Sequence, residues 1–134
     1  MKNQLNIGLL VLRITLGILF ILHGIAKLKS GVSGMQGMFE SKGLPGFIAY
    51  AVYIGEVLAP IMLLLGFRVK LAALFYMATM LVALLVVHRG DIFILDQNTG
   101  GSAVEVQLLY LFGALALFFT GGGKYALSTR NKWD

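Results

Sequence analysis

Ionisable side chains interrupt two long apolar stretches of this sequence. Arg13 and His23 lie within residues 5–28, and Glu56 lies within residues 47–66. An unpaired charge in hydrocarbon costs at least about 2.5–3.5 kcal/mol, so such groups pair with one another or serve a function. An Arg13–Glu56 ion pair would satisfy both charges. It would be either a purely structural link between two helices or the polar floor of a ligand cavity.

A second set of polar residues falls near the ends of apolar stretches. It consists of His23, Lys27, His88, Glu105 and Gln107. In antiparallel helices these groups share one layer, which could hold a quinone head group, an anionic substrate or a metal ion. We expect His23 to find its hydrogen-bond partner in Glu105 or Gln107, and Tyr53, one turn before Glu56, to donate to that carboxylate.

Each member of this layer also has a structural explanation. The two histidines can be interfacial residues, Lys27 can extend its ammonium group toward water, and Glu105 can complement the dipole at a helix start. Glu105 and Gln107 are about 200° apart on an ideal helix, so both cannot face one pocket. The functional and structural interpretations both remain open at this point.

Several chemistries find no support in the residues. The chain has no cysteine, so disulfides, thiolate metal sites and Cys-x-x-Cys electron transfer are excluded. His23 would lie about one turn deeper than His88, which argues against haem, and we expect no metal site. No catalytic motif is recognisable, so enzymatic activity stays open and a redox role would need a bound cofactor or a partner. The net charge of +5 is scattered, so nucleic acid is not an expected partner.

The composition places these residues in a lipid bilayer. Of 134 residues, 58% are hydrophobic and 13% charged, and the mean hydropathy is +0.86. Soluble domains average about 45–50% apolar and about 25% charged residues. We predict a single all-α membrane domain, a bundle of four transmembrane helices at about residues 5–28, 47–66, 71–87 and 103–120. The first stretch is expected to be a span and not a cleaved signal peptide, because it is too long and contains Arg13.

The distribution of cations predicts the orientation of the four spans. The side with both termini and the loop at residues 66–70 carries six cations: Lys2, Arg68, Lys70, Lys124, Arg130 and Lys132. The opposite side carries four, so both termini are predicted to be cytoplasmic, in a cell (inner) membrane. At 1.5 Å per residue, Arg13 and Glu56 would then lie roughly 12 Å and 14 Å from their nearer surfaces, both close to the middle of the membrane.

The face of the first span that carries Arg13 is also its expected packing face. Gly17, Phe20, Gly24 and Lys27 follow Arg13 at offsets that fall within about 40° of one line along a helix. Small residues on such a line let a neighbouring helix approach closely.

These motifs resemble the DoxX family of small membrane proteins over nearly the whole chain. The resemblance rests on Leu12-Arg13 with Gly17, Phe20, His23-Gly24 and Lys27-Leu28, on Gly55-Glu56 leading to Leu65-Gly66, on His88, and on Glu105-x-Gln107-Leu108-Leu109-Tyr110. It implies a four-helix membrane bundle associated with respiratory or thiol-linked oxidoreductase systems, since the family name comes from a subunit linked to quinone-dependent sulfur oxidation. One departure is Ala59-Pro60, where family members often carry glycine, and it predicts a kink beside Glu56.

Two functions follow as hypotheses. The first is a redox-associated membrane subunit that binds a quinone or similar small molecule within the bundle, with electrons supplied by an oxidoreductase partner. The second is a non-enzymatic small-molecule binder, carrier or assembly scaffold, acting as a homo-oligomer if it transports. Four helices without internal repeats disfavour alternating access by a single copy.

Reporter fusions test the predicted orientation. Fusions after Gly66 and after Lys132 should report a cytoplasmic location, and fusions within residues 30–41 and 91–102 should report the outside. The reverse pattern would show that the charge distribution does not set the orientation of this chain.

Overall fold

Helices follow the apolar stretches of the sequence. The computed structural model describes residues 1–134 and contains no strand, only an isolated β-bridge between Leu95 and Ser102. The all-α class is therefore confirmed. In chain order the elements are α1 (Lys2–Ser30), α2 (Ser33–Ser41), the 3₁₀ segment η1 (Gly46–Ala51), the π segment η2 (Ile54–Leu58), α3 (Ala59–Leu65), α4 (Val69–Val82), the π segment η3 (Ala83–Val87) and α5 (Glu105–Thr120).

Three helical segments are long and apolar enough to cross a membrane. They are Lys2–Ser30, Gly46–Leu65 and Val69–Val87. The helix of the fourth predicted span, α5, has 16 residues, fewer than the roughly 20 that a span needs. The count of four spans therefore stays a prediction, as does the division of the chain into one membrane domain.

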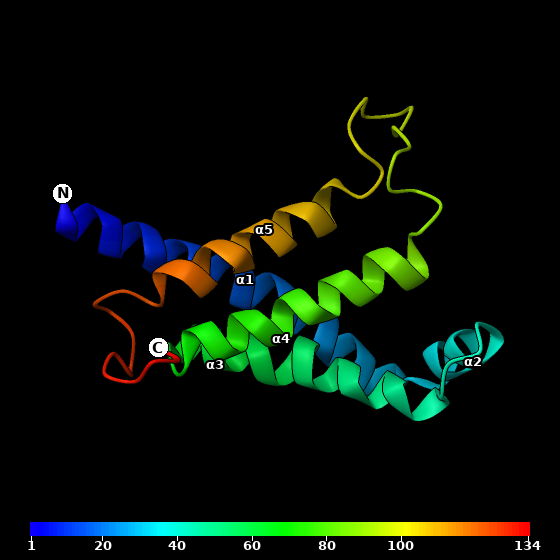
Figure 1. Cartoon of the computed structure of the whole chain (residues 1–134), viewed down its shortest axis with the longest axis horizontal. Helices are drawn as coiled ribbons and strands as arrows, with labels where there is room; N and C mark the ends of the chain where they lie inside the picture. The colour runs from blue at the N-terminus through cyan, green and yellow to red at the C-terminus, as the bar shows by residue number, and fades with distance from the viewer.

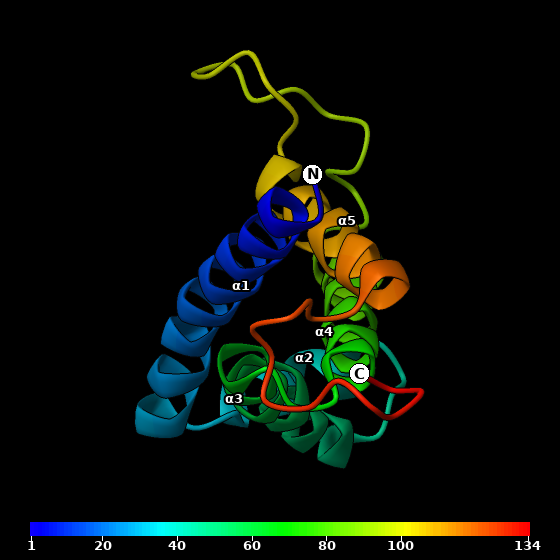
Figure 2. The same ribbon diagram turned by 90° about the vertical axis from the view of Figure 1, so that its left-hand side faces the viewer.

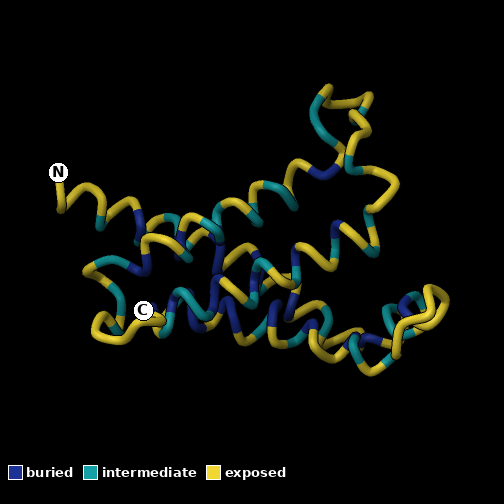
Figure 3. Tube along the Cα trace, in the orientation of Figure 1, coloured by how far each residue is buried: buried dark blue, intermediate teal, exposed yellow.

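The long helices pack as a closed ring. α1 contacts α3 and α5, and α4 contacts the same two helices. Ala72, Ala73 and Ala114 are fully buried, which lets the helix backbones approach. Burial is greatest in the middle of the bundle, as Figure 3 shows, whereas many large apolar side chains lie exposed on the outward faces. Outward-facing leucine and phenylalanine suit a bundle surrounded by lipid.

The two ends of the bundle differ in what they carry. Both termini and the turn between α3 and α4 lie at one end, here called the terminal end, while α2 and the loop at residues 88–104 lie at the other, the loop end (Figure 1). This arrangement is the one expected for antiparallel spans. Which end faces the cytoplasm stays a prediction.

Pro60 interrupts the regular helix of the second span. Proline has no N–H and cannot donate to the carbonyl of Glu56, four residues earlier. The chain forms a π turn directly before it, in which the Ala59 N–H bonds to the Ile54 carbonyl. A second π turn ends the third span, where the His88 N–H bonds to the Ala83 carbonyl. Single π turns of this kind are frequent at functional sites.

Gly24 lies where α1 meets the first π turn. A Cβ atom at this position would collide with the backbone carbonyl of Glu56. Arg13, Gly17, Phe20 and Gly24 are all buried, so the predicted packing face of the first span is confirmed for these four residues.

The C-terminal segment, residues 121–134, folds back across the terminal end of the bundle (Figure 2). Asp134 accepts hydrogen bonds from Arg68 Nη1 at 3.0 Å and from the Ser128 hydroxyl at 2.7 Å. Burial alone would raise the pKa of Asp134, but the hydrogen bonds from Ser128 and Asn131 and the positive charge of Arg68 lower that pKa to about 2. The segment is thus tied to the turn between α3 and α4.

Substitution of Gly24 tests the close approach of the first two spans. Gly24→Ala should lower the unfolding free energy by about 1–3 kcal/mol, because the added methyl group forces α1 away from the Glu56 carbonyl. The measurement is thermal unfolding in detergent. Gly8→Ala in the same helix is the matched control, since a Cβ there has no neighbour within 4 Å. Equal effects of the two substitutions would contradict the close contact.

Candidate ligand cavity

A cavity of about 530 Å³ lies in the half of the bundle nearer the loop end. Of its 22 lining residues, 15 are hydrophobic, and the volume falls in the range typical of small-molecule sites. α1, α2, both π turns, α4 and α5 all contribute to its wall. The side chains with polar or ionisable groups in that wall are those of His23, Lys27, Glu56, Thr79, His88, Gln107 and Tyr110.

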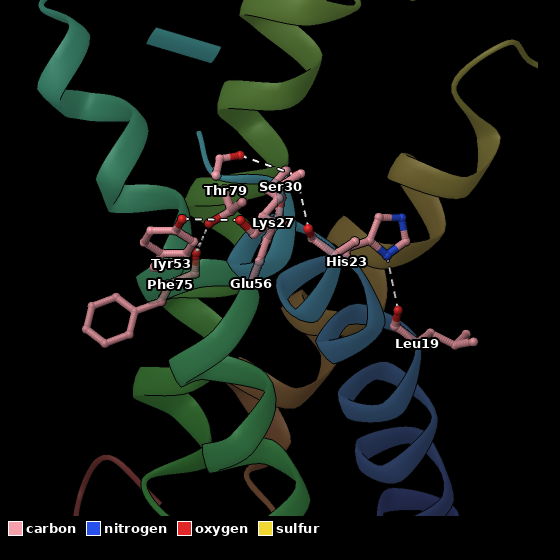
Figure 4. A network of polar contacts seen from close by, with 10 residues as sticks. Leu19, His23, Lys27, Ser30, Tyr53, Glu56, Phe75 and Thr79 are labelled. Carbon is pink, nitrogen blue, oxygen red and sulfur yellow. Dashed lines mark hydrogen bonds and ion pairs between the residues drawn. The ribbon is translucent and has the colours of Figure 1, made fainter. Parts of the chain in front are cut away.

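An ion pair between Lys27 and Glu56 forms one side of the cavity. The Lys27 ammonium nitrogen lies 2.6 Å from Glu56 Oε1, and the Glu56 side chain is only 7% exposed. The second carboxylate oxygen, Oε2, is buried and receives no hydrogen bond from the protein. Figure 4 shows the pair where α1 crosses the second span. This contact is a charge-assisted hydrogen bond in a mostly apolar wall.

Glycines and the π turn position the pair. Gly24, one turn before Lys27, packs on the backbone of Glu56, and Gly55 packs on the Thr79 side chain of α4. A larger residue at Gly24 would separate the two helices that carry the charges, and a larger residue at Gly55 would push the second span away from α4. Tyr53 donates its hydroxyl hydrogen bond to the Lys27 carbonyl at 3.3 Å, so the prediction that it donates to Glu56 is wrong. Its bond instead ties the second span to the backbone of α1.

The predicted Arg13–Glu56 ion pair is wrong. Arg13 is 2% exposed, and its guanidinium donates to the carbonyls of Gly122 at 3.1 Å and Tyr125 at 3.0 Å. Its depth was misplaced because α1 begins at Lys2 and runs past the ends of its neighbours. Arg13 therefore lies beside Gly66, in the turn between α3 and α4, and beside Gly122, and it does not line the cavity.

His23 does not make the predicted contact with Glu105 or Gln107. Its Nδ1 lies 3.1 Å from the Leu19 carbonyl of its own helix, and the residue is exposed. Figure 4 shows the ring pointing away from the Lys27–Glu56 pair. A local backbone contact engages Nδ1 of the imidazole in place of a partner on α5, and His23 lines the cavity as an exposed residue at its rim.

His88 and Gln107 meet across the loop end of the cavity. Their side-chain nitrogens, both Nε2, are 3.3 Å apart, and His88 Nδ1 is 3.7 Å from Asp91. Glu105 is exposed and its carboxylate folds back toward Gly101, outside the cavity. Of the two α5 residues Glu105 and Gln107, only Gln107 lines the cavity, in agreement with their separation of about 200° around the helix. Of the five residues of the predicted polar layer, Lys27, His88 and Gln107 line the cavity, His23 lines it as an exposed residue, and Glu105 does not line it.

Comparison with known proteins shows which family the chain belongs to. Residues 8–89, more than half of the chain, match the DoxX family. The chain belongs to the DoxX family. This stretch includes Lys27, Glu56 and His88, and so covers most of the polar wall of the cavity.

Curated relatives cover this DoxX protein almost completely. It is 30% identical over 127 residues to "Putative oxidoreductase CatD" of Bacillus subtilis (strain 168), covering 95% of this chain and 89% of the relative. It is 30% identical over 135 residues to "Inner membrane protein YqjF" of Escherichia coli (strain K12), covering 99% and 100%. An uncharacterized protein of Haemophilus influenzae is 31% identical over 122 residues, covering 89% and 87%. No solved structure matches the chain. The family, the apolar helices and the inner-membrane relative support a membrane location for this DoxX protein.

Some cavity residues of this DoxX protein were not anticipated from the sequence. Met35 and Phe39 reach the cavity from α2, a short helix within the loop between the first two spans. Their spacing of four residues, with Met38 between them, is a helical signal in a stretch otherwise rich in glycine and serine. Thr79 and Tyr110 lie inside apolar stretches and carry no charge, and neither was predicted to line a cavity, although Tyr110 belongs to a motif that resembles the DoxX family.

Double substitutions test the ion pair of this DoxX protein. Lys27→Met leaves a buried carboxylate without its partner and should destabilise the fold, and Glu56→Gln should relieve much of that loss. We expect a coupling of about 1–3 kcal/mol, between the values of exposed and fully buried pairs. The measurement is unfolding of the four variants in detergent.

Arg13→Leu provides the matched control for this cycle. Because Arg13 contacts no carboxylate, its effect should add to that of Glu56→Gln to within about 0.5 kcal/mol. Additive effects for Lys27 and Glu56, or strong coupling between Arg13 and Glu56, would contradict the observed pairing.

Proposed function

We propose that this DoxX protein is a redox-associated membrane subunit that binds a quinone or a similar small molecule in its cavity. The observation that carries the proposal is a largely apolar cavity of about 530 Å³ with a few polar groups in its wall. A quinone head group has this character, since it is a flat apolar ring with a polar oxygen at each end. Small-molecule sites generally combine an apolar lining with a few polar groups that orient the ligand.

The polar groups of the cavity suit the two ends of such a ring. Lys27 and Glu56 lie where α1 crosses the second span, and His88 and Gln107 lie at the loop end. The aromatic side chains of Phe20 and Tyr110, whose ring centroids are 5.7 Å apart, also line the cavity. A ring bound there would contact apolar side chains over its faces and polar groups at its edges.

The relatives support the redox part of the proposal. One of them carries the name of an oxidoreductase. This chain has no cysteine, and no group of three or more His, Asp or Glu side chains is close enough to hold a metal ion. In this proposal, the electrons for a bound quinone come from a partner oxidoreductase. We further propose an inner-membrane location with both termini in the cytoplasm, which places the cavity in the outer half of the membrane.

Quinone titration of the purified protein in lipid nanodiscs tests binding. A short-chain quinone should bind to the wild-type protein and should raise its unfolding temperature. Ala83→Phe, which adds a ring at the cavity wall, should weaken binding at least about tenfold, or about 1.4 kcal/mol. Ala116→Phe is the matched control, because Ala116 is exposed on α5 and does not line the cavity.

Two outcomes would contradict the proposal. Absence of binding for both the oxidised and the reduced form would exclude a quinone site, and equal binding by Ala83→Phe and wild type would place the ligand elsewhere. Purification of the native assembly then tests the redox role. Co-purification of an oxidoreductase supports it, whereas a ligand-binding homo-oligomer without such a partner supports the non-enzymatic binder or carrier.

A further inference from the structure

The two oxygens of the Glu56 carboxylate have different surroundings. Oε1 accepts a hydrogen bond from the Lys27 ammonium group at 2.6 Å. Oε2 is buried and no donor of the protein reaches it. An ionised carboxylate only accepts hydrogen bonds, and each of its oxygens can take more than one. A buried acceptor without a donor costs free energy, so Oε2 is a strong candidate for a ligand contact.

The neighbouring hydroxyl groups of the protein are already engaged. Thr79 donates to the Phe75 carbonyl at 3.0 Å, and Tyr53 donates to the Lys27 carbonyl at 3.3 Å. Apolar side chains make up most of the remaining wall. Glu56 lines the cavity, and a molecule bound there can supply the donor that Oε2 lacks.

We propose that the cavity selects the reduced, hydroxylated form of its aromatic ligand, with a phenolic hydroxyl donating to Glu56 Oε2. This inference rests on the proposed function and names the chemical form that the site takes. A quinol or a phenol carries the O–H group that Oε2 lacks. An oxidised quinone carries only carbonyl oxygens at the ring edge, and would place lone pairs against the lone pairs of the carboxylate.

The other polar groups of the cavity fit the same ligand. His88, Gln107 and Tyr110 also line the cavity, and their side chains include both donors and acceptors. A second ring hydroxyl can donate to or accept from these groups, so they tolerate either oxidation state. The discrimination between oxidation states therefore falls to Glu56.

A set of matched ligands tests this selectivity under anaerobic conditions. The probes are a methyl-substituted para-benzoquinone, its quinol and the dimethyl ether of that quinol, which keeps the ring but has no O–H group. The wild-type protein in nanodiscs should bind the quinol at least about tenfold more tightly than either other probe, because a site with a buried acceptor rejects ligands that cannot donate to it.

Two isosteric substitutions identify the group that is responsible. Glu56→Gln presents an amide, which both donates and accepts, so the preference for the quinol should fall to less than about threefold while the quinone still binds. Glu105→Gln makes the same chemical change on an exposed residue outside the cavity, and it should keep the wild-type preference.

The wild-type measurements alone decide the inference if Glu56→Gln fails to fold. Equal affinity for quinol, quinone and dimethyl ether would overturn it, because water would then supply the donor to Oε2, and the proposed function would stand. A full preference for the quinol retained in a folded Glu56→Gln variant would also overturn it. Failure of all three probes to bind to the wild type would overturn the proposed function itself.

Discussion

The ion pair between Lys27 and Glu56 brings two opposite charges together inside an apolar wall. Removing charges from water is costly, and the cost is recovered only when the partners are close and well oriented. The contact of 2.6 Å requires α1 and the second span to approach closely at one point. Gly24 permits that approach, and the Tyr53 hydroxyl holds the second span to the carbonyl of Lys27. The geometry of the cavity depends on this crossing.

Pro60 shapes the same crossing from the other side. Because proline cannot donate to the Glu56 carbonyl, the helix passes through a π turn before it regains regular α geometry. The π turn at Ala83–Val87 widens the facing helix at the loop end. The π turns in the second and third spans leave space between these helices near the loop end. In the middle of the bundle, buried small residues let the helices pack closely. The cavity therefore lies where π turns interrupt two spans, and the Lys27–Glu56 ion pair in its wall gives a ligand both a charged donor and a charged acceptor.

Arg13 forms the polar anchor at the opposite end of the bundle. Its guanidinium donates to two backbone carbonyls of the C-terminal segment, and Asp134 in that segment binds Arg68. The buried charge of Arg13 is stabilised by carbonyl dipoles and not by a carboxylate. This leaves Glu56 free for Lys27. The two charged centres are thus separated along the bundle, one holding the C-terminal segment in place and the other facing the cavity.

Composition and hydropathy were sufficient to predict an all-helical membrane protein, because the need to satisfy backbone hydrogen bonds in lipid leaves an apolar chain few alternatives. The face of α1 that packs against its neighbours was also predictable, since helical spacing places Arg13, Gly17, Phe20 and Gly24 on one line. The partners of the charged residues Arg13, Lys27 and Glu56 were not predictable from the sequence. Arg13 and Lys27 share that line, and only the tertiary structure decides which of them reaches Glu56, because helix ends and the path of the C-terminal segment set their depths. The roles of α2, Thr79 and Tyr110 in the cavity likewise arise from packing between segments distant in the chain, which local spacing does not encode.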